Sequence, residues 1–203
     1  MTRMFSISDN PVHGFNSQPH SKHGTYTLTT VLGLWLHELE ERYGQRNMEY
    51  TILGIEFGGA VPHVWYPGGR DRKHVAIRLA DVARENIAEA LFELAHETVH
   101  LLNPTDNATV IEEGLAVDFS HEKSYGVDGH DKFAHQKDYL YCEAKLKELL
   151  SISPDAIMRL RKIQPSLSAL TPAMIRSLDS RISADLAECL CKPKNDLSLD
   201  DDS

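Results

Sequence analysis

Hydrophobic residues recur at helical spacing in the first regularly patterned part of the chain. Thr29 or Thr30 can accept hydrogen bonds from the first free N–H groups of such a helix, and Gly44 can end it in a conformation that other residues avoid. The pattern therefore predicts an amphipathic helix that begins near Thr29. Its buried face consists of Val31, Leu32, Trp35, Leu36 and Leu39.

Hydrophobic and polar residues alternate in the next part of the chain, as they do in strands with one buried face. Strands are predicted at residues 50–57, 63–66 and 74–79, and the turn-forming residues 67–72 join the last two as a hairpin. In the first strand, one face is expected to carry Thr51, Leu53, Ile55 and Phe57. In the third strand, the inward face is expected to carry Val75, Ile77 and Leu79, and the outward face His74, Ala76 and Arg78.

Helical spacing returns after residue 80 and continues through most of the remaining chain. One helix is expected from Asp81 or Val82 to Leu102, because the Asn-Pro pair that follows prevents its continuation. Pro154 and Pro172 each follow Ser or Thr and fit a first helical position. Further helices are predicted at residues 107–119, 131–150, 154–163 and 172–190.

This succession of elements predicts an α+β protein, in which a small N-terminal mixed or antiparallel sheet precedes a mainly helical C-terminal part. Residues 27–194 are expected to form one domain, with an α+β part at 27–103 and a helical part at 104–194. Residues 1–26 are rich in Ser, Asn, Gly and Pro and predict an irregular arm. The acidic residues 195–203 predict a disordered tail.

Composition narrows the classes of function. The formal net charge of −9 and the absence of a Lys/Arg run argue against nucleic-acid binding. The sequence contains neither the apolar core of a signal peptide nor about eighteen consecutive apolar residues. We therefore expect a cytoplasmic protein that does not associate with membranes. The odd cysteine count favours reduced thiols over a disulfide framework. These cysteines are Cys142, Cys189 and Cys191.

Residues 96–100 read His-Glu-Thr-Val-His and carry the clearest chemical signal in the chain. Residues four apart lie on one face of a helix, so His96 and His100 can direct two imidazole nitrogens at one metal ion. Glu97 lies beside that face, where its carboxylate can act as general base on an activated water. The pattern indicates a zinc-dependent hydrolase.

The surroundings of this motif favour a metal site over two exposed histidines. Apolar residues with helical spacing surround it and argue for burial, and buried polar groups need partners. A third ligand is still required, because a catalytic zinc ion takes three protein ligands and keeps one open position. Glu112 and Glu113 offer it from the next predicted helix, whereas His63 and His74 are expected on strand surfaces.

The motif followed by Glu113-Gly114-Leu115-Ala116 resembles the gluzincin metallopeptidases, in which a His-Glu-x-x-His helix precedes a Glu-Gly-hydrophobic-Ala helix. The resemblance covers roughly residues 74–120. It implies a zincin-like fold, peptide-bond hydrolysis, and Glu113 as the third zinc ligand. It also implies that an edge strand before the motif helix, the strand at 74–79 or its hairpin partner, pairs with an extended substrate.

Two roles in the gluzincin pattern have no assigned residue here. Some members carry an Asp four residues after the ligand Glu as a partner for a ligand histidine; that position is Val117, and Asp118 comes one later. The Tyr or His that supports the oxyanion is also unassigned. The downstream residues of suitable type are His121, Tyr125 and His130, and none is chosen.

A rival third ligand is Asp106. His96 to Asp106 resembles the metzincin spacing, with Asn103 at the position of the turn glycine. Pro104 restricts that turn, no methionine fits a Met-turn, and Asp106 can equally cap the next helix, so Glu113 is preferred. Peptide deformylases share the pentapeptide but need an upstream ligand cysteine, and every cysteine here lies downstream.

The sequence therefore predicts a cytoplasmic zinc metallopeptidase with a peptide or protein substrate, metal ligands His96, His100 and Glu113, and Glu97 as general base. Iron or manganese would also accept two imidazoles and a carboxylate, but such sites do not need a glutamate between the histidines. The alternative is a zincin-fold binding or regulatory protein with little peptidase activity. The intact glutamate in the motif argues against it.

Overall fold

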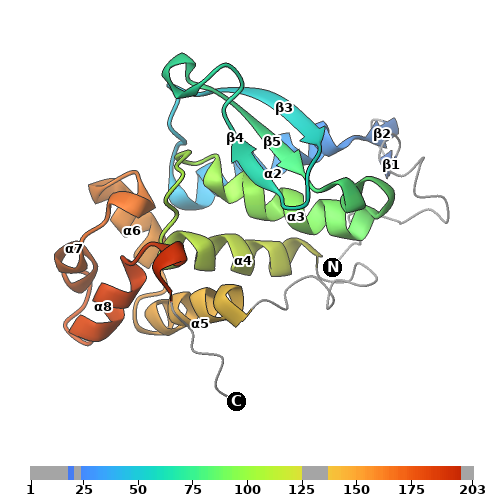
Figure 1. Cartoon of the computed structure of the whole chain (residues 1–203). Coiled ribbons are helices and arrows are strands. Elements are labelled where there is room, and N and C mark those ends of the chain that lie inside the picture. The colour runs from blue at the N-terminus through green and yellow to red at the C-terminus, as the bar shows by residue number, and fades with distance from the viewer. Residues whose placement is uncertain (1–17, 21–23, 125–136, 198–203) are drawn as a thin grey trace.

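A computed structural model describes residues 18–20, 24–124 and 137–197. These residues form a mixed α+β structure with seven helices, a three-stranded sheet and a two-stranded ribbon (Figure 1). The strands are β1 (Gln18–His20), β2 (Gly24–Tyr26), β3 (Thr51–Phe57), β4 (His63–Trp65) and β5 (His74–Leu79). The helices are α2 (Leu28–Tyr43), α3 (Ile87–His100), α4 (Val110–Ser124), α5 (Lys137–Ile152), α6 (Ala156–Ile163), α7 (Pro172–Arg176) and α8 (Ala184–Leu190).

The sheet has the strand order β3-β5-β4 and is mixed. β3 runs parallel to β5, whereas β4 is antiparallel to β5 and forms the predicted hairpin with it. The central strand β5 is buried on its inward face as predicted, and Ala76 is buried as well. β4 is therefore an edge strand, and Figure 1 shows it on the side of the sheet above α3.

The predicted face of β3 is wrong in its first half. The register shifts between Ile52 and Gly54, and Gly54 has a φ of 138°, which other residues rarely adopt. This irregularity leaves Leu53 54 % exposed and packs Ile52 against the core. Ile55 keeps its predicted inward position.

Helix α2 has the predicted buried face, but its N-cap is Thr27, whose side chain accepts a hydrogen bond from the Thr30 N–H. Helix α3 begins later than predicted. Residues Asp81–Glu85 form a 3-10 turn, and Asn86 then caps α3 by accepting hydrogen bonds from the N–H groups of Ala88 and Glu89. Asparagine is a strong N-cap residue, so α3 starts at the cap rather than at the first apolar residue.

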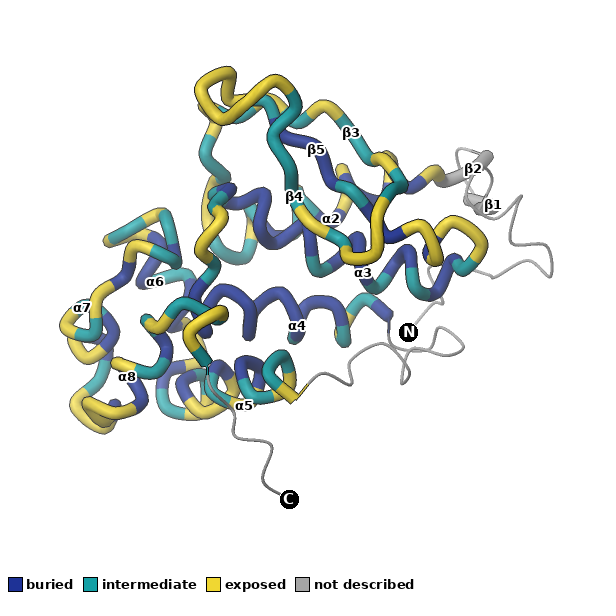
Figure 2. The backbone as a smooth tube through the Cα atoms, viewed as in Figure 1, coloured by how far each residue is buried: buried dark blue, intermediate teal, exposed yellow. Residues whose placement is uncertain are grey.

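The helices lie in layers beneath the sheet (Figure 1). α2 and α3 contact the sheet, α4 packs against α3, and α5 packs against the other side of α4. Gly114 lets α4 and α5 approach closely, because a Cβ there would lie 2.5 Å from the carbonyl oxygen of Cys142. Nearly the whole of α4 is consequently buried (Figure 2).

The C-terminal part is helical, with one difference from prediction. Residues 172–190 form two helices, since α7 ends at Arg176 and α8 is capped by the Ser183 side chain. The apolar residues Leu178 and Ile182 in the connection are nevertheless buried. Thr171 caps α7, and Pro172 takes its first position as predicted.

The chain ends differ in part from their predicted irregular structure. β1 and β2 pair as an antiparallel ribbon in the predicted arm, and Lys194–Asp196 forms a 3-10 turn at the start of the predicted tail. The rest of both predictions, at 1–17, 21–23 and 198–203, lies outside the described residues, as does the predicted helical stretch 131–136.

One hydrophobic core cluster extends from Leu28 in α2 to Leu190 in α8 and includes the inward side chains of β5. It therefore joins the sheet and the C-terminal helices through α3 and α4. None of the described helices is long and apolar enough to span a bilayer.

Candidate metal centre

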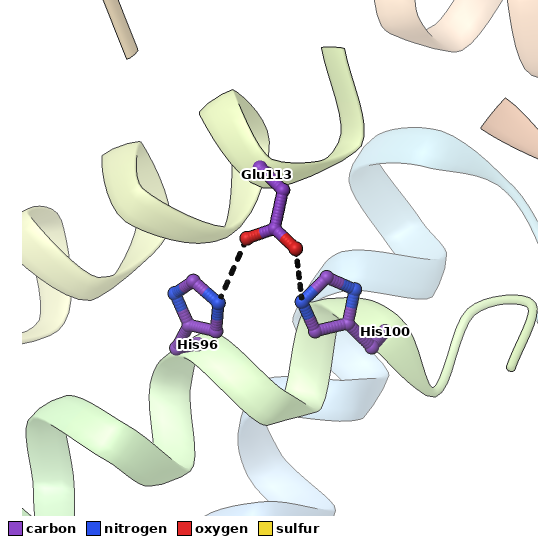
Figure 3. Close-up of side chains that lie close together, drawn as sticks. All are labelled: His96, His100 and Glu113. Atoms are coloured by element: carbon purple, nitrogen blue, oxygen red, sulfur yellow. Dashed lines mark ion pairs between the residues drawn. The ribbon is translucent and has the colours of Figure 1, made fainter. Parts of the chain in front are cut away.

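Helix α3 presents His96 and His100 on one face, one turn apart, with their ring centroids separated by 5.1 Å. The apolar residues on the opposite side of α3 hold it against α2 and the sheet, so this histidine face is turned toward α4. Both imidazoles direct Nε2 toward the same carboxylate (Figure 3). The histidine spacing and the predicted burial thus agree with the structure.

That carboxylate belongs to Glu113, in the first turn of α4. Its Oε2 lies 3.2 Å from Nε2 of His96, and its Oε1 lies 3.9 Å from Nε2 of His100. Glu113 is buried, and its Oε2 has no hydrogen-bond partner among the described residues. A buried carboxylate whose two oxygens each face one imidazole nitrogen, with one of these oxygens lacking a hydrogen bond, fits a position where the carboxylate and both imidazoles bind one cation.

One ligand atom from each of His96, His100 and Glu113 lies within 4.8 Å of the other two. Two imidazoles and one carboxylate on adjacent helices can therefore hold a metal ion. Such a trio leaves room for further ligands, because a tetrahedral or octahedral ion needs at least one more.

Glu112 supports His100 through the imidazole nitrogen that faces away from Glu113. Nδ1–H of His100 donates a hydrogen bond of 2.9 Å to Oε1 of Glu112, and the Ser168 hydroxyl donates to the other oxygen of this carboxylate. This contact directs Nε2 of His100 toward Glu113, an arrangement that orients metal-binding histidines in many proteins. Neighbouring residues on α4 thus divide two roles between them: Glu113 faces the cluster, and Glu112 supports one of its histidines.

Carboxylates surround the two histidines of the cluster and shift the pKa values within it. Burial lowers the pKa of His100, but the hydrogen bond to Glu112 and the charges of Glu113, Glu112 and Glu97 outweigh it and raise that pKa to about 10. Burial raises the pKa of Glu113, but the contact with His96 and the charges of both histidines lower it to about 2. The surrounding carboxylates therefore favour positive charge at the centre of the cluster.

Glu97 lies beside the cluster without belonging to it. Its side chain is only 4 % exposed, and burial raises its pKa, against the opposing charges of His100 and His96. It lines the cleft at the cluster, as His96 does. A carboxylate with a raised pKa in that position can accept a proton and return it.

The two other acidic residues considered from the sequence point elsewhere. Asp106 is exposed and forms an ion pair with Arg70, and it is not in the His-His-Glu group, although it lines the same hollow. Asp118 forms an ion pair with Lys147 at 3.7 Å rather than with a ligand histidine. Glu112 fills the supporting role instead.

Two adjoining hollows meet at the cluster and share His96, Glu97, Tyr139 and Lys194. The first, here called the metal-side hollow, has a volume of about 300 Å³ and is also lined by His63, Val64, His100, Asp106 and Glu113. The second, here called the acidic pocket, has a volume of about 390 Å³ and is also lined by Val61, Glu89, Phe92, Glu93 and Val117. Together they form a cleft between α3 and the edge of the sheet at β4.

No family model, no curated protein and no solved structure matches this chain. The chemistry of the site therefore rests on its own residues.

Tyr139 and Lys194 were missed by the sequence reasoning. The Tyr139 ring lies edge-on to His96 at 5.5 Å, and the Lys194 ammonium lies 4.1 Å from the centre of the Tyr139 ring. Lys194 also forms an ion pair of 2.7 Å with Asp138. Neither residue stands near the motif in sequence, so no local pattern could have assigned them.

The remaining histidines and tyrosine considered from the sequence do not join the cluster within the described residues. His121 forms an ion pair of 2.8 Å with Glu143. His63 is exposed on β4 and lines the metal-side hollow, while His74 begins β5. Tyr125 and His130 lie outside the described residues.

Proposed function

We propose that this protein is a zinc-dependent metallopeptidase with a zincin-like arrangement of sheet and active-site helix. The observation that carries the proposal is the buried group of His96, His100 and Glu113, with the non-ligand carboxylate of Glu97 next to it in an open cleft. A binding site that only held a structural ion would have no need of a free carboxylate at this place.

Zinc fits the donor set because it binds imidazole nitrogen and carboxylate oxygen and takes three protein ligands in catalytic sites. A zinc ion held there would lower the pKa of water and polarise a substrate carbonyl. Glu112 fixes the orientation of His100 through Nδ1, so that its Nε2 is available to the ion.

Glu97 is proposed as general base and then general acid. Burial raises its pKa and suits it to take a proton from water and return it to the departing amine. Tyr139, whose ring packs against His96 in the cleft, is proposed to donate its hydroxyl hydrogen to the oxyanion that develops on the carbonyl. Lys194 beside it adds positive charge on the same side.

β4 is proposed to bind the substrate backbone. It is an edge strand that pairs with β5 on one side, and His63 and Val64 of β4 line the metal-side hollow. An extended peptide can add to such an edge through main-chain hydrogen bonds, which would lay a peptide bond across the metal cluster. The substrate class that follows is an extended peptide or an unfolded segment of a protein.

The test is peptide cleavage by the zinc-loaded protein and by Glu97→Gln. Glu97→Gln should retain zinc, because Glu97 is not a ligand, and should lose about 10²- to 10⁴-fold in kcat. Cleavage is measured with a quenched-fluorescent peptide library, and zinc by mass spectrometry. Full activity in Glu97→Gln would remove Glu97 from the mechanism. Zinc-dependent peptide binding without any cleavage would favour the alternative of a zincin-fold binding protein.

A further inference from the structure

The acidic pocket is built along the N-terminal half of α3. Glu93 and Glu89 precede His96 by three and seven residues, so they lie on the same side of α3 at about 4.5 and 10 Å from it along the helix axis. Phe92, Val61 and Val117 add apolar surface to the walls. The pocket therefore combines an apolar wall with two carboxylates at increasing distance from the metal cluster along α3.

Neither of these two carboxylates has a cationic partner in the part of the chain that the structure describes. Glu93 is only 8 % exposed; its Oε2 accepts a hydrogen bond of 2.9 Å from the Ala80 N–H, and no ion pair involves it. Glu89 accepts one hydrogen bond, of 3.4 Å, from the Asn86 side chain. The charges that act on Glu93 are those of Glu89 and Glu97, both negative.

Such an arrangement is unfavourable unless a cation enters. Burial and the like charges of Glu89 and Glu97 raise the pKa of Glu93 to about 7, although the hydrogen bond from Ala80 opposes them. Lys194 also lines the pocket, but its ammonium is held by Asp138 at 2.7 Å and lies over the Tyr139 ring. Among the described residues, the negative charge on α3 thus has no cationic partner and is available to a ligand.

We propose that the acidic pocket binds the cationic side chain of a lysine or arginine residue next to the scissile peptide bond, with Glu93 as the principal partner and Glu89 as the one farther from the metal cluster. This inference rests on the proposed peptidase function and names its substrate class. A four-carbon lysine chain packs along Phe92 and Val61 and carries its ammonium about one helical turn from the metal cluster, where Glu93 lies.

A free α-amino group has the same charge but a different reach. It is attached directly to the Cα of the terminal residue, beside the scissile carbonyl. Glu93 lies about one turn along α3 from the metal cluster, and this position suits the end of a long side chain better than an α-amino group. The test therefore distinguishes binding of a cationic side chain from binding of a free amino terminus.

The experiment measures binding of metal-chelating hydroxamates to the zinc-loaded full chain by calorimetry. N-acetylated lysine and norleucine ligands share a four-carbon side chain and differ only in the ammonium group. Two series are used, with the side chain on the acyl side or on the amine side of the chelating group. Free and acetylated norleucine ligands test the amino terminus. The variants are Glu93→Gln, Glu89→Gln and, as a control of equal charge change, the exposed Glu85→Gln.

In one of the two series we expect the lysine ligand to bind the wild type at least about tenfold more tightly than norleucine. Glu93→Gln, which keeps an oxygen for the Ala80 N–H, should bring this ratio close to one; Glu89→Gln should reduce it less, and Glu85→Gln should leave it unchanged. Equal, zinc-dependent binding of both ligands in both series would overturn the inference and leave the metal site intact. A preference for the free amine without one for lysine would also overturn it. Absence of both zinc and hydroxamate binding would instead overturn the proposed function.

Discussion

Two pairs of carboxylates lie on the helices around the cleft, and they differ in their partners. Glu112 and Glu113 on α4 are 4 % and 8 % exposed, and each contacts an imidazole of α3. Glu93 on α3 is also 8 % exposed, yet neither it nor Glu89 has a cation beside it among the described residues. Burial of a carboxylate is unfavourable in both places, but among the described residues only the α4 pair is offset by neighbouring imidazoles.

The difference separates two kinds of binding. The α4 pair and the histidines form a group that the fold itself assembles, and three of its members, His96, His100 and Glu113, can hold a metal ion. The α3 pair forms the wall of a pocket whose charge is left for a ligand. Substitutions that disturb the α4 pair should therefore affect metal retention. Substitutions in the α3 pair should affect the choice of ligand and the pH dependence of stability.

The largest expected effect comes from moving α4 itself. Gly114→Ala places a Cβ 2.5 Å from the Cys142 carbonyl oxygen and 2.9 Å from Cβ of Leu146, so α4 and α5 must separate. We expect the free energy of unfolding to fall by about 3 kcal/mol, together with loss of metal binding. Gly33→Ala in α2 is the control, because nothing lies within 4 Å of its Cβ position. It should stabilise by about 0.5–1 kcal/mol. Urea denaturation measures both, and equal stability of the two variants would contradict the close packing of α4.

Replacing the partner of His100 should have the next largest effect. Glu112→Gln keeps an oxygen that can accept from Nδ1 but removes the charge, so we expect zinc affinity to fall about ten- to a hundredfold. Competition with a chelating dye measures the affinity. Asp118→Asn on the same helix is the matched control, since Asp118 pairs with Lys147, and its zinc affinity should equal that of the wild type. A loss with Asp118→Asn and none with Glu112→Gln would reverse the assignment of the supporting carboxylate.

The smallest effect concerns the charge of Glu93. Its folded-state pKa of about 7 lies above the ordinary 4.5, so the folded protein holds this proton at pH values where the unfolded chain has lost it. The contribution of Glu93 to stability therefore falls as pH rises from about 4.5 through 7. Relative to wild type, Glu93→Gln should gain about 1–2 kcal/mol between pH 5 and pH 8 in the presence of a chelator. Denaturation at both pH values measures it. A relative loss over this range would mean that a cation already pairs with Glu93.

The parts of the site that depend on helix periodicity could be predicted from the sequence. The spacing of His96 and His100 fixes their common face, and the adjacent Glu112 and Glu113 meet that face once α4 returns beside α3. Helix periodicity alone could not show which of these glutamates faces the metal cluster and which supports His100, because the direction of each side chain depends on the rotation of α4. That rotation follows from contacts with α5, including the close approach at Gly114.

Residues brought in by distant elements could not be predicted. Tyr139 reaches the cleft from α5 and Lys194 from the 3-10 turn near the C-terminus, and no periodicity links either to the motif. Periodicity also misplaced helix ends. Ala83 continues the apolar pattern before the Asn86 cap, Leu178 and Ile182 continue it across the break between α7 and α8, and all three are buried. Apolar spacing reports which residues are buried, whereas caps and turns decide where the backbone is helical.

Predictions from sequence periodicity also succeed in one part of the sheet and fail in another. The hairpin of β4 and β5 and the central strand follow the predicted alternation, because a single unbroken strand places every second side chain on one face. In β3 the irregular register near Gly54 interrupts that alternation, and Leu53 turns to solvent. The mixed α+β class was confirmed, while the gluzincin resemblance remains a prediction that the metal and its chemistry must test.

The most direct test of the metal centre is the zinc content of the purified wild type, Glu113→Ala and Asp106→Ala, measured by mass spectrometry after zinc is supplied and excess is removed. Near-stoichiometric zinc is expected in the wild type and in Asp106→Ala, because Asp106 pairs with Arg70 outside the cluster. Glu113→Ala should lose it, because one of the three converging ligands is gone. Zinc retained in Glu113→Ala but lost in Asp106→Ala, or no zinc in any of the three proteins, would contradict a metal centre of His96, His100 and Glu113.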